Sequence, residues 1–173
     1  MLGHGAGGSV SAPDLLAATR VALEADLSVA LVEQPYLVAG RKNPPPAPKL
    51  DEAWLSVIEQ LAPSRPLIAG GRSSGARVAC RTAEATGAVA ALCLAFPLQP
   101  PARASGTAPE SRLYELDAVQ VPVLVVQGEN DQFGMPPPGP RRQVARVAGD
   151  HGLKKDLGAV ASAIQAWIAS LDL

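Results

Sequence analysis

The residues best suited to chemistry surround one serine. In the segment Gly71-Arg-Ser-Ser-Gly75 the pattern G-x-S-x-G follows an apolar run and precedes an alanine-rich run with helical character. This pattern is typical of a nucleophilic serine, here Ser73, held on a sharp turn between a strand and a helix. The amide of Ser74, at the start of the new helix, would face an oxyanion forming at Ser73. The alternative is a glycine-rich turn at a strand end that carries no chemistry.

A base must accompany this serine, because a serine hydroxyl is a weak nucleophile until its proton is removed. The chain contains two histidines, and His151 follows the last predicted strand and precedes the last predicted helix. Catalytic groups gather at the carboxyl edge of open parallel sheets, so we expect His151 at the same edge as Ser73. The alternative is a surface-loop histidine without a catalytic role.

An acidic residue is also needed, to orient the imidazole and to stabilise its protonated form. The predicted strand Val121–Gln127 leads into a turn that ends in Asp131. We predict that Asp131 is this acid, with Glu129 as a competitor two residues away. Asp150 adjoins His151, and side chains of neighbouring residues on an extended loop usually diverge. An aspartate that serves only to form the turn is the alternative.

A glycine-rich segment, His4-Gly-Ala-Gly-Gly8, opens the chain. A turn here can present a backbone amide, from Ala6 or Gly7, as the second oxyanion donor. We expect His4 to shape this turn rather than to act as an acid or base. Phosphate binding by the glycines is a weaker alternative, because no G-K-[ST] sequence follows and almost no strand precedes the turn.

A parallel sheet covered by helices would bring these residues together. Short apolar runs alternate with helical patterns, which is typical of an α/β fold. Strands are predicted at Leu27–Glu33, Pro66–Ala69, Val89–Phe96, Val121–Gln127 and Gln143–Ala148. Helices are predicted over Leu50–Leu61 and Leu157–Leu171, after Ser73, and from about Pro13 to Ala25 with Ser11 as the cap. Surface loops are predicted at Pro44–Pro48, Pro100–Pro109 and Pro136–Pro140.

Composition excludes several classes of function. The chain has 173 residues, 47% of them hydrophobic and 3% aromatic, which indicates one globular domain over residues 1–173. A net charge of −1 with scattered basic residues argues against nucleic-acid binding. Cys80 and Cys93 lie in apolar surroundings and are predicted to be buried free thiols, and we predict no metal or cofactor. No apolar run is long enough to span a membrane and no signal peptide is recognisable, so we expect a cytoplasmic protein.

The ordered combination of motifs resembles a known family. It is similar to the compact alpha/beta-hydrolase family related to dienelactone hydrolases, which includes the KANL- and TEX-type hydrolase-like proteins. The resemblance covers nearly the whole chain. It rests on HGAGG at residues 4–8, Pro35–Arg41, GGRSSGAR at 70–77, Phe96–Leu98, Arg112 with Leu116, Val121–Leu124, Gly128 with Asp131 and Phe133-Gly134, and Gly149–His151 with Leu153-Lys154.

This resemblance implies an alpha/beta-hydrolase-like three-layer sandwich with a mostly parallel sheet, shortened at its N-terminus and without a large lid. It implies Ser73 as nucleophile, Asp131 as acid and His151 as base, with the amides of Ala6 and Ser74 as oxyanion donors. The function that follows is hydrolysis of a small ester or related acyl compound through an acyl-enzyme. A non-catalytic hydrolase-like protein that binds a partner is the rival hypothesis.

Two departures from the family affect the expected structure. Family members carry a strand before the HG turn, in the middle of the sheet, whereas only Met1–Gly3 precede His4 here. We therefore expect the sheet to be incomplete beside the strand leading to Ser73, or to be completed by another chain, for example in a homodimer. The family's helix before the last strand is replaced by the proline-rich segment Gly134–Pro140.

Candidate residues for the substrate pocket lie near the predicted triad. The connection between Phe96 and Val121 is short, which argues against a large lid and a buried lipid-type pocket. Side chains that could contact the substrate, or could equally be structural, are those of Tyr36, Arg41, Arg72 and Phe133.

Overall fold

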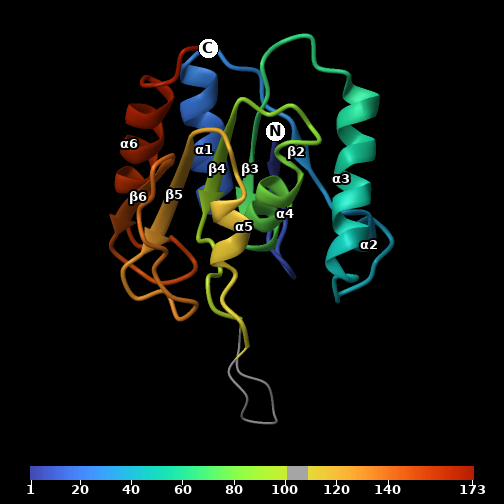
Figure 1. Cartoon of the computed structure of the whole chain (residues 1–173). Helices are drawn as coiled ribbons and strands as arrows, with labels where there is room; N and C mark the ends of the chain where they lie inside the picture. The colour runs from blue at the N-terminus through green and yellow to red at the C-terminus, as the bar shows by residue number, and fades with distance from the viewer. Residues whose placement is uncertain (101–108) are drawn as a thin grey trace.

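A sheet of six parallel strands forms the centre of the protein (Figure 1), which a computed structural model describes for residues 1–100 and 109–173. The strand order is β2-β1-β3-β4-β5-β6, and every neighbouring pair is parallel. The strands are β1 (Leu2–Gly3), β2 (Leu31–Val32), β3 (Ile68–Arg72), β4 (Ala90–Leu94), β5 (Val123–Gly128) and β6 (Arg142–Val147). The predicted strands are thus present, although that near residue 30 is shorter than expected.

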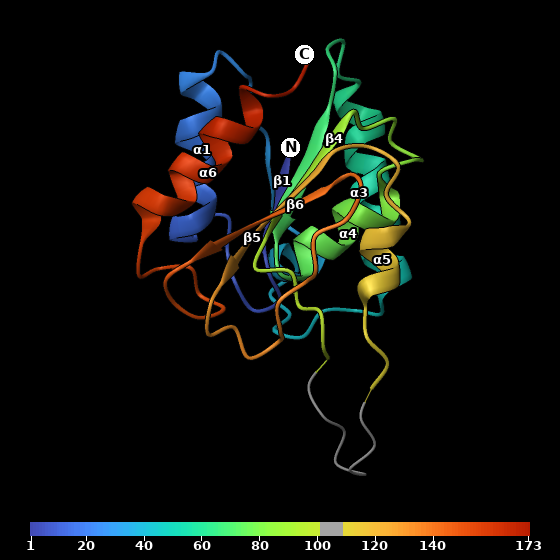
Figure 2. The ribbon, with the colours of Figure 1, turned by 60° about the vertical axis from the view of Figure 1, so that its left-hand side comes forward.

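Helices cover both faces of this sheet, as Figure 2 shows. On one face lie α1 (Pro13–Glu24) and α6 (Leu157–Ile168). On the other lie α3 (Ala47–Leu61), α4 (Ser74–Thr82) and the short α5 (Leu113–Asp117), while α2 (Pro35–Val38) follows β2. The predicted three-layer architecture is confirmed, and the two short helices α2 and α5 were not predicted.

Each face of the sheet has its own hydrophobic core. Ala91, Cys93 and Val125 point toward α3 and α4, and pack in the cluster that contains Trp54 and Phe96. The alternate residues Leu92, Leu94 and Val126 face α1 and α6, in the cluster that contains Leu15, Ile164 and Trp167. Successive side chains of a strand point to opposite faces, and both faces are covered, so β4 is apolar throughout and β5 is apolar from Val123 to Val126.

The two cysteines lie between α4 and β4 as buried free thiols, as predicted. Their sulfur atoms are 3.4 Å apart. The hydrogen bond with Cys80, together with burial, raises the pKa of the Cys93 thiol well above its usual value. A thiol of this kind is a poor nucleophile.

The prediction of a gap beside β3 was wrong, because the two residues of β1 occupy the slot. Leu2 pairs with Leu31 of β2 and with Gly70 of β3. The Leu2 amide donates to the Ala30 carbonyl at 2.8 Å, and the Gly70 amide donates to the Met1 carbonyl at 2.9 Å. Even this two-residue strand forms backbone hydrogen bonds with the strands on both sides. Neither a shift of β2 nor a second chain is therefore needed beside Leu2 and Gly3.

Two other expectations change, and a third falls mostly on residues that the structure does not describe. Ser11 is not the cap of α1; Ala12 holds that position, and the Ser11 hydroxyl hydrogen-bonds Ser9. Pro48 is not in a loop but in the first turn of α3, where the missing proline N–H costs nothing. Residues 101–108 lie outside the described residues. They make up most of the predicted loop Pro100–Pro109 and about a third of the connection between Phe96 and Val121. As predicted, no helix lies between β5 and β6.

Close packing of β1 against α4 explains why residue 75, in the G-x-S-x-G turn around Ser73, is a glycine. A Cβ on Gly75 would collide with the backbone oxygens of Gly3 and His4. We expect Gly75→Ala to lower the free energy of unfolding by about 3 kcal/mol or more, because backbone atoms must shift to make room. Urea unfolding followed by circular dichroism would measure the change.

A matched control is Gly158→Ala, since Gly158 is also the second residue of a helix, α6. Its Cβ would meet only the Asp156 carboxylate, at 3.5 Å. This variant should be neutral or slightly more stable, because alanine loses less backbone freedom on folding. A Gly75→Ala protein as stable as the Gly158→Ala protein would contradict the close contact of β1 with α4.

Candidate active site

Ser73 lies on a strained turn between β3 and α4. Its backbone has φ 53° and ψ −110°, in a region that L-residues rarely adopt, and its amide donates to the Leu94 carbonyl at 2.9 Å. Gly71 before it has no room for a side chain, because a Cβ there would press on the backbone of Gly3 and Gly75. The close approach of β1 and the sharp turn together present the Ser73 side chain at the carboxyl edge of the sheet.

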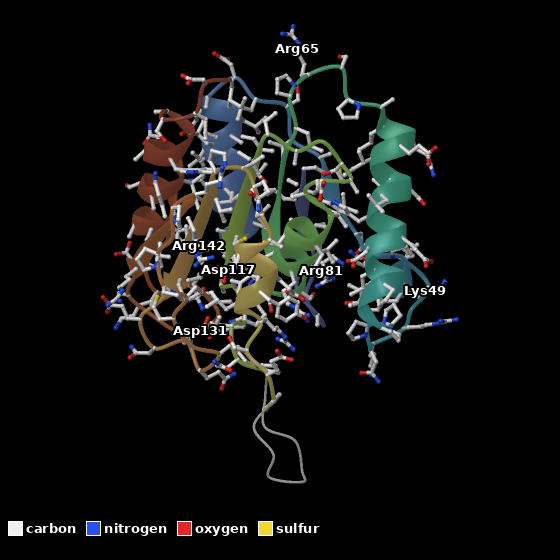
Figure 3. All side chains as sticks on the ribbon, viewed as in Figure 1. Lys49, Arg65, Arg81, Asp117, Asp131 and Arg142 are labelled. Carbon is white, nitrogen blue, oxygen red and sulfur yellow. The ribbon has the colours of Figure 1, made fainter. Side chains whose placement is uncertain are left out.

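The structure brings Ser73, His151 and Asp131 together in a chain of hydrogen bonds. The His151 Nε2 atom is 3.0 Å from the Ser73 Oγ, and its Nδ1 is 2.8 Å from the Asp131 Oδ2. Because a carboxylate can only accept, Nδ1 carries the proton in the neutral ring and Nε2 is free to accept from the serine. Asp131 lies on the loop after β5 (Figure 3) and its side chain is fully buried, whereas that of His151 is 18% exposed.

The Asp131 carboxylate is held from two further directions. Gln127, the buried polar residue near the end of β5, donates from Nε2 to Asp131 Oδ2 at 2.8 Å, and the Phe133 amide donates to Oδ1 at 2.9 Å. Gln127 is itself fixed, because the same nitrogen lies 3.0 Å from the Phe96 carbonyl. These donors stabilise the charged carboxylate and fix the oxygen that His151 contacts.

The two acidic alternatives lie elsewhere. Glu129 is exposed, and Asp150 turns back to accept the Gly152 amide at 2.8 Å.

The glycine-rich turn at residues 4–8 is fixed by His4, which is fully buried. The His4 Nε2 accepts the Gln34 amide at 2.9 Å, so its Nδ1 carries the proton and donates to the Gly5 carbonyl at 2.8 Å. Both ring nitrogens are therefore occupied by backbone groups, one in the turn and one in the segment after β2. Among the described residues, neither the Ala6 amide nor the Ser74 amide donates to a protein acceptor.

The four candidate substrate contacts have different surroundings. Phe133 lies edge-on to the His151 ring, with centroids 4.5 Å apart. Tyr36 is buried in the core beside His4, and its hydroxyl has no partner among the described residues. Arg41 is exposed. Arg72 turns back onto the protein and contacts Asp14 and the His151 carbonyl.

Asp14, Gln34 and Gln127 are site residues that the sequence analysis missed. Each is a polar residue that is at least 97% buried. A polar side chain at the end of an apolar strand, as at Gln127, is the one signal that could have indicated such a role. Asp14 and Gln34 contact residues that are distant in the chain, so the sequence alone does not indicate these contacts.

A cavity of about 310 Å³ opens beside His151. It is lined by Asn130, Gln132, Asp150, His151, Gly152 and Lys154, so His151 is the one triad residue that lines it. A larger, more apolar cavity of about 680 Å³ lies at the opposite end of the sheet, around Leu27, Leu67 and Trp167, and no triad residue lines it.

No group of three or more histidine, cysteine or acidic side chains could hold a metal ion within residues 1–100 and 109–173. The helices of the same residues include none long and apolar enough to cross a bilayer.

A parallel sheet with this strand order, a strained serine elbow, and an acid and a histidine on later loops of the same edge define the alpha/beta-hydrolase class. The family model described as an alpha/beta hydrolase domain matches residues 1–157, and the chain belongs to this family. A comparison with curated protein sequences finds no match.

Solved structures share the fold at low sequence identity. Est1E from Butyrivibrio proteoclasticus, with ferulic acid bound, has a TM-score of 0.75 and 15% identity, over 97% of this chain and 86% of that one. A serine hydrolase without a lid from Xanthomonas campestris has a TM-score of 0.70 and 18% identity, over 96% and 81%. Alpha/beta hydrolase domain-containing protein 10 from mouse has a TM-score of 0.70 and 15% identity, over 97% and 88%.

Proposed function

We propose that this protein is a serine hydrolase that cleaves small esters or related acyl compounds through an acyl-enzyme. The observation that carries the proposal is the relay from Ser73 Oγ to His151 Nε2 at 3.0 Å and from His151 Nδ1 to Asp131 at 2.8 Å. Both separations are within hydrogen-bonding reach without any rearrangement, which is the geometry that nucleophile activation requires.

The proposed reaction has two halves. The Ser73 oxygen attacks the acyl carbon while His151 Nε2 takes the hydroxyl proton, and the resulting oxyanion accepts hydrogen bonds from the Ala6 and Ser74 amides. His151 then returns the proton to the leaving alkoxide, and the acyl group remains on Ser73. A water molecule attacks this ester, gives its proton to His151, and releases the acid as Ser73 regains its proton.

The surroundings of the triad favour a small substrate with polar groups. The cavity beside His151 is about 310 Å³, near the lower end of the range for small-molecule pockets, and it is lined by polar residues. Phe133 adds one apolar surface against the imidazole. Ferulic acid, bound in the Est1E structure, is a small carboxylic acid of the kind that such a reaction releases.

Labelling with a fluorophosphonate probe tests the proposal directly. The probe reacts with serines that an adjacent base activates. We therefore expect one probe molecule to modify each native protein molecule, and peptide mass spectrometry should locate the modification at Ser73. The fraction of p-nitrophenyl acetate hydrolysis that is lost should equal the fraction of the protein that the probe has labelled. A folded protein that neither labels nor hydrolyses short acyl esters would favour the rival hypothesis, a hydrolase-like protein that binds a partner.

A further inference from the structure

Arg72 occupies the elbow beside the proposed nucleophile, yet the reaction above does not use its charge. Its Nη2 donates to the backbone carbonyl of His151 at 2.8 Å, and its Nε lies 2.8 Å from the Asp14 Oδ2. The same guanidinium packs on the glycine-rich turn, because a Cβ on Gly5 would lie 3.0 Å from Arg72 Nη1. The Arg72 side chain therefore contacts the glycine-rich turn at residues 4–8, the start of α1, and the loop of residues 149–153 that carries His151.

Asp14 supplies a fixed counter-ion for this arginine. Its side chain is fully buried at the start of α1, and its Oδ1 accepts the Leu15 amide at 3.0 Å. Among the described residues its Oδ2 accepts no hydrogen bond of good geometry, so the contact with Arg72 is an ion pair. Burial raises the pKa of Asp14, and the neighbouring Arg72 opposes that rise. Arg72 is the one cation that pairs with this buried carboxylate in the described part of the chain, and the pairing restricts where the guanidinium can lie.

The loop that carries His151 contains two glycines, and the Asn130 amide already holds its start by donating to the Gly149 carbonyl at 2.9 Å. Gly149 has φ +124°, a conformation that favours glycine, and Gly152 follows His151, so the backbone is intrinsically flexible on both sides. Leu153 is fully buried and fixes the far end of the loop. The Arg72 hydrogen bond acts on the His151 peptide itself and holds the backbone from which the imidazole extends.

We propose that Arg72, oriented by Asp14, is a positioning residue that fixes the His151 backbone so that Nε2 stays within reach of the Ser73 hydroxyl. The effect of Arg72 on the reaction rate rests on the proposed hydrolase function. Its effect on the position of residues 149–153 does not. This role differs from the substrate contact predicted from the sequence, because two of the three guanidinium nitrogens, Nε and Nη2, are directed at protein oxygens.

Steady-state kinetics separates the two roles. For Arg72→Met we expect kcat to fall about 10- to 100-fold, because a small misplacement of a catalytic group slows the chemical step. The KM for the neutral ester p-nitrophenyl acetate should stay within about twofold, since ground-state binding is untouched. A substrate contact would instead raise KM for an anionic ester, such as the p-nitrophenyl monoester of succinic acid, and leave kcat for both esters unchanged; that result would overturn the proposal.

A double-mutant cycle tests whether Asp14 acts through Arg72. Asp14→Asn should lower kcat less than Arg72→Met does, and the double variant should lose no more activity than Arg72→Met alone. The double variant also removes the unpaired buried carboxylate that Arg72→Met leaves behind, so it keeps the test available if the single variant does not fold. Losses that multiply would show that the two residues act independently and would contradict the proposal.

The matched control is Arg81→Met. The Arg81 side chain is also 18% exposed and forms ion pairs with Asp51 and Glu115, but it contacts no triad residue. Figure 3 shows it on the helical layer near α3, away from Asp131. We expect this variant to lose stability and to retain the kcat of the native protein. An equal fall in kcat in both variants would mean that general destabilisation, and not positioning, explains the result.

Hydrogen–deuterium exchange provides a readout that does not depend on activity. Peptides covering residues 149–153 should exchange faster in Arg72→Met, and in the double variant, than in the native protein or in Arg81→Met. If the native protein fails to label with the probe, the hydrolase proposal falls while this comparison still decides the positioning role. Unchanged exchange over residues 149–153 in both Arg72 variants would overturn it.

Discussion

Replacing Ser73 with alanine should lower kcat for short acyl esters by about 10⁴-fold or more and abolish fluorophosphonate labelling. The substitution removes the oxygen that forms the acyl-enzyme in the proposed reaction, while His151 and Asp131 keep their own hydrogen bond. The Ser73 Oγ has only the His151 Nε2 as a partner among the described residues, so little packing is lost. The melting temperature should therefore stay within a few degrees of that of the native protein.

Stopped assays with p-nitrophenyl acetate and intact-protein mass spectrometry after labelling would measure both effects. Ser56→Ala serves as the control, because Ser56 is an exposed serine of α3, and it should leave labelling and turnover unchanged. Native turnover in the Ser73→Ala protein would show that either Ser74 or no serine is the nucleophile.

Asp131→Asn has the second large expected effect, a fall in kcat of about 10⁴-fold. The carboxylate can only accept the His151 Nδ1 proton, whereas an asparagine amide can donate to Nδ1 and place the ring proton on Nε2. A ring protonated at Nε2 cannot accept the proton of Ser73. The fold should persist, because the asparagine oxygen can still accept the Phe133 amide.

Glu129→Gln is the matched control for this substitution. It also exchanges a carboxylate for an amide, on the same turn, but at an exposed position. We expect its kcat to equal that of the native protein at pH 7. If Glu129→Gln lost as much activity as Asp131→Asn, Asp131 would not be the acid of the relay.

The serine elbow could be predicted from the sequence because its requirements are local. A nucleophile on a strained turn needs glycines at fixed offsets, and the apolar strand and the alanine-rich helix must flank it directly. The candidate positions of His151 and Asp131 followed from a second simple rule, that loops after parallel strands meet at one sheet edge. The long strands β4 and β5 were also predictable, because burial on both faces leaves β4 and the first four residues of β5 apolar.

The central strand was decided by tertiary structure. Two residues, Leu2 and Gly3, have no propensity pattern that could indicate a strand. They form one only because Leu31 and Gly70 present hydrogen-bonding groups on either side and because Gly75 leaves room for the backbone. Sequence reasoning treated this segment as too short, since it judged the strand by length and could not see its neighbours.

The supports of the site also depend on the folded chain. Gln127 reaches Asp131 across a turn, whereas Asp14, Arg72 and the His151 carbonyl come from three segments far apart in the sequence. The sequence by itself determined which residue types could form the relay and in which order they occur. Tertiary structure decided which buried polar groups hold them, because a buried donor or acceptor must find a partner in space and that partner leaves no periodic signal in the chain.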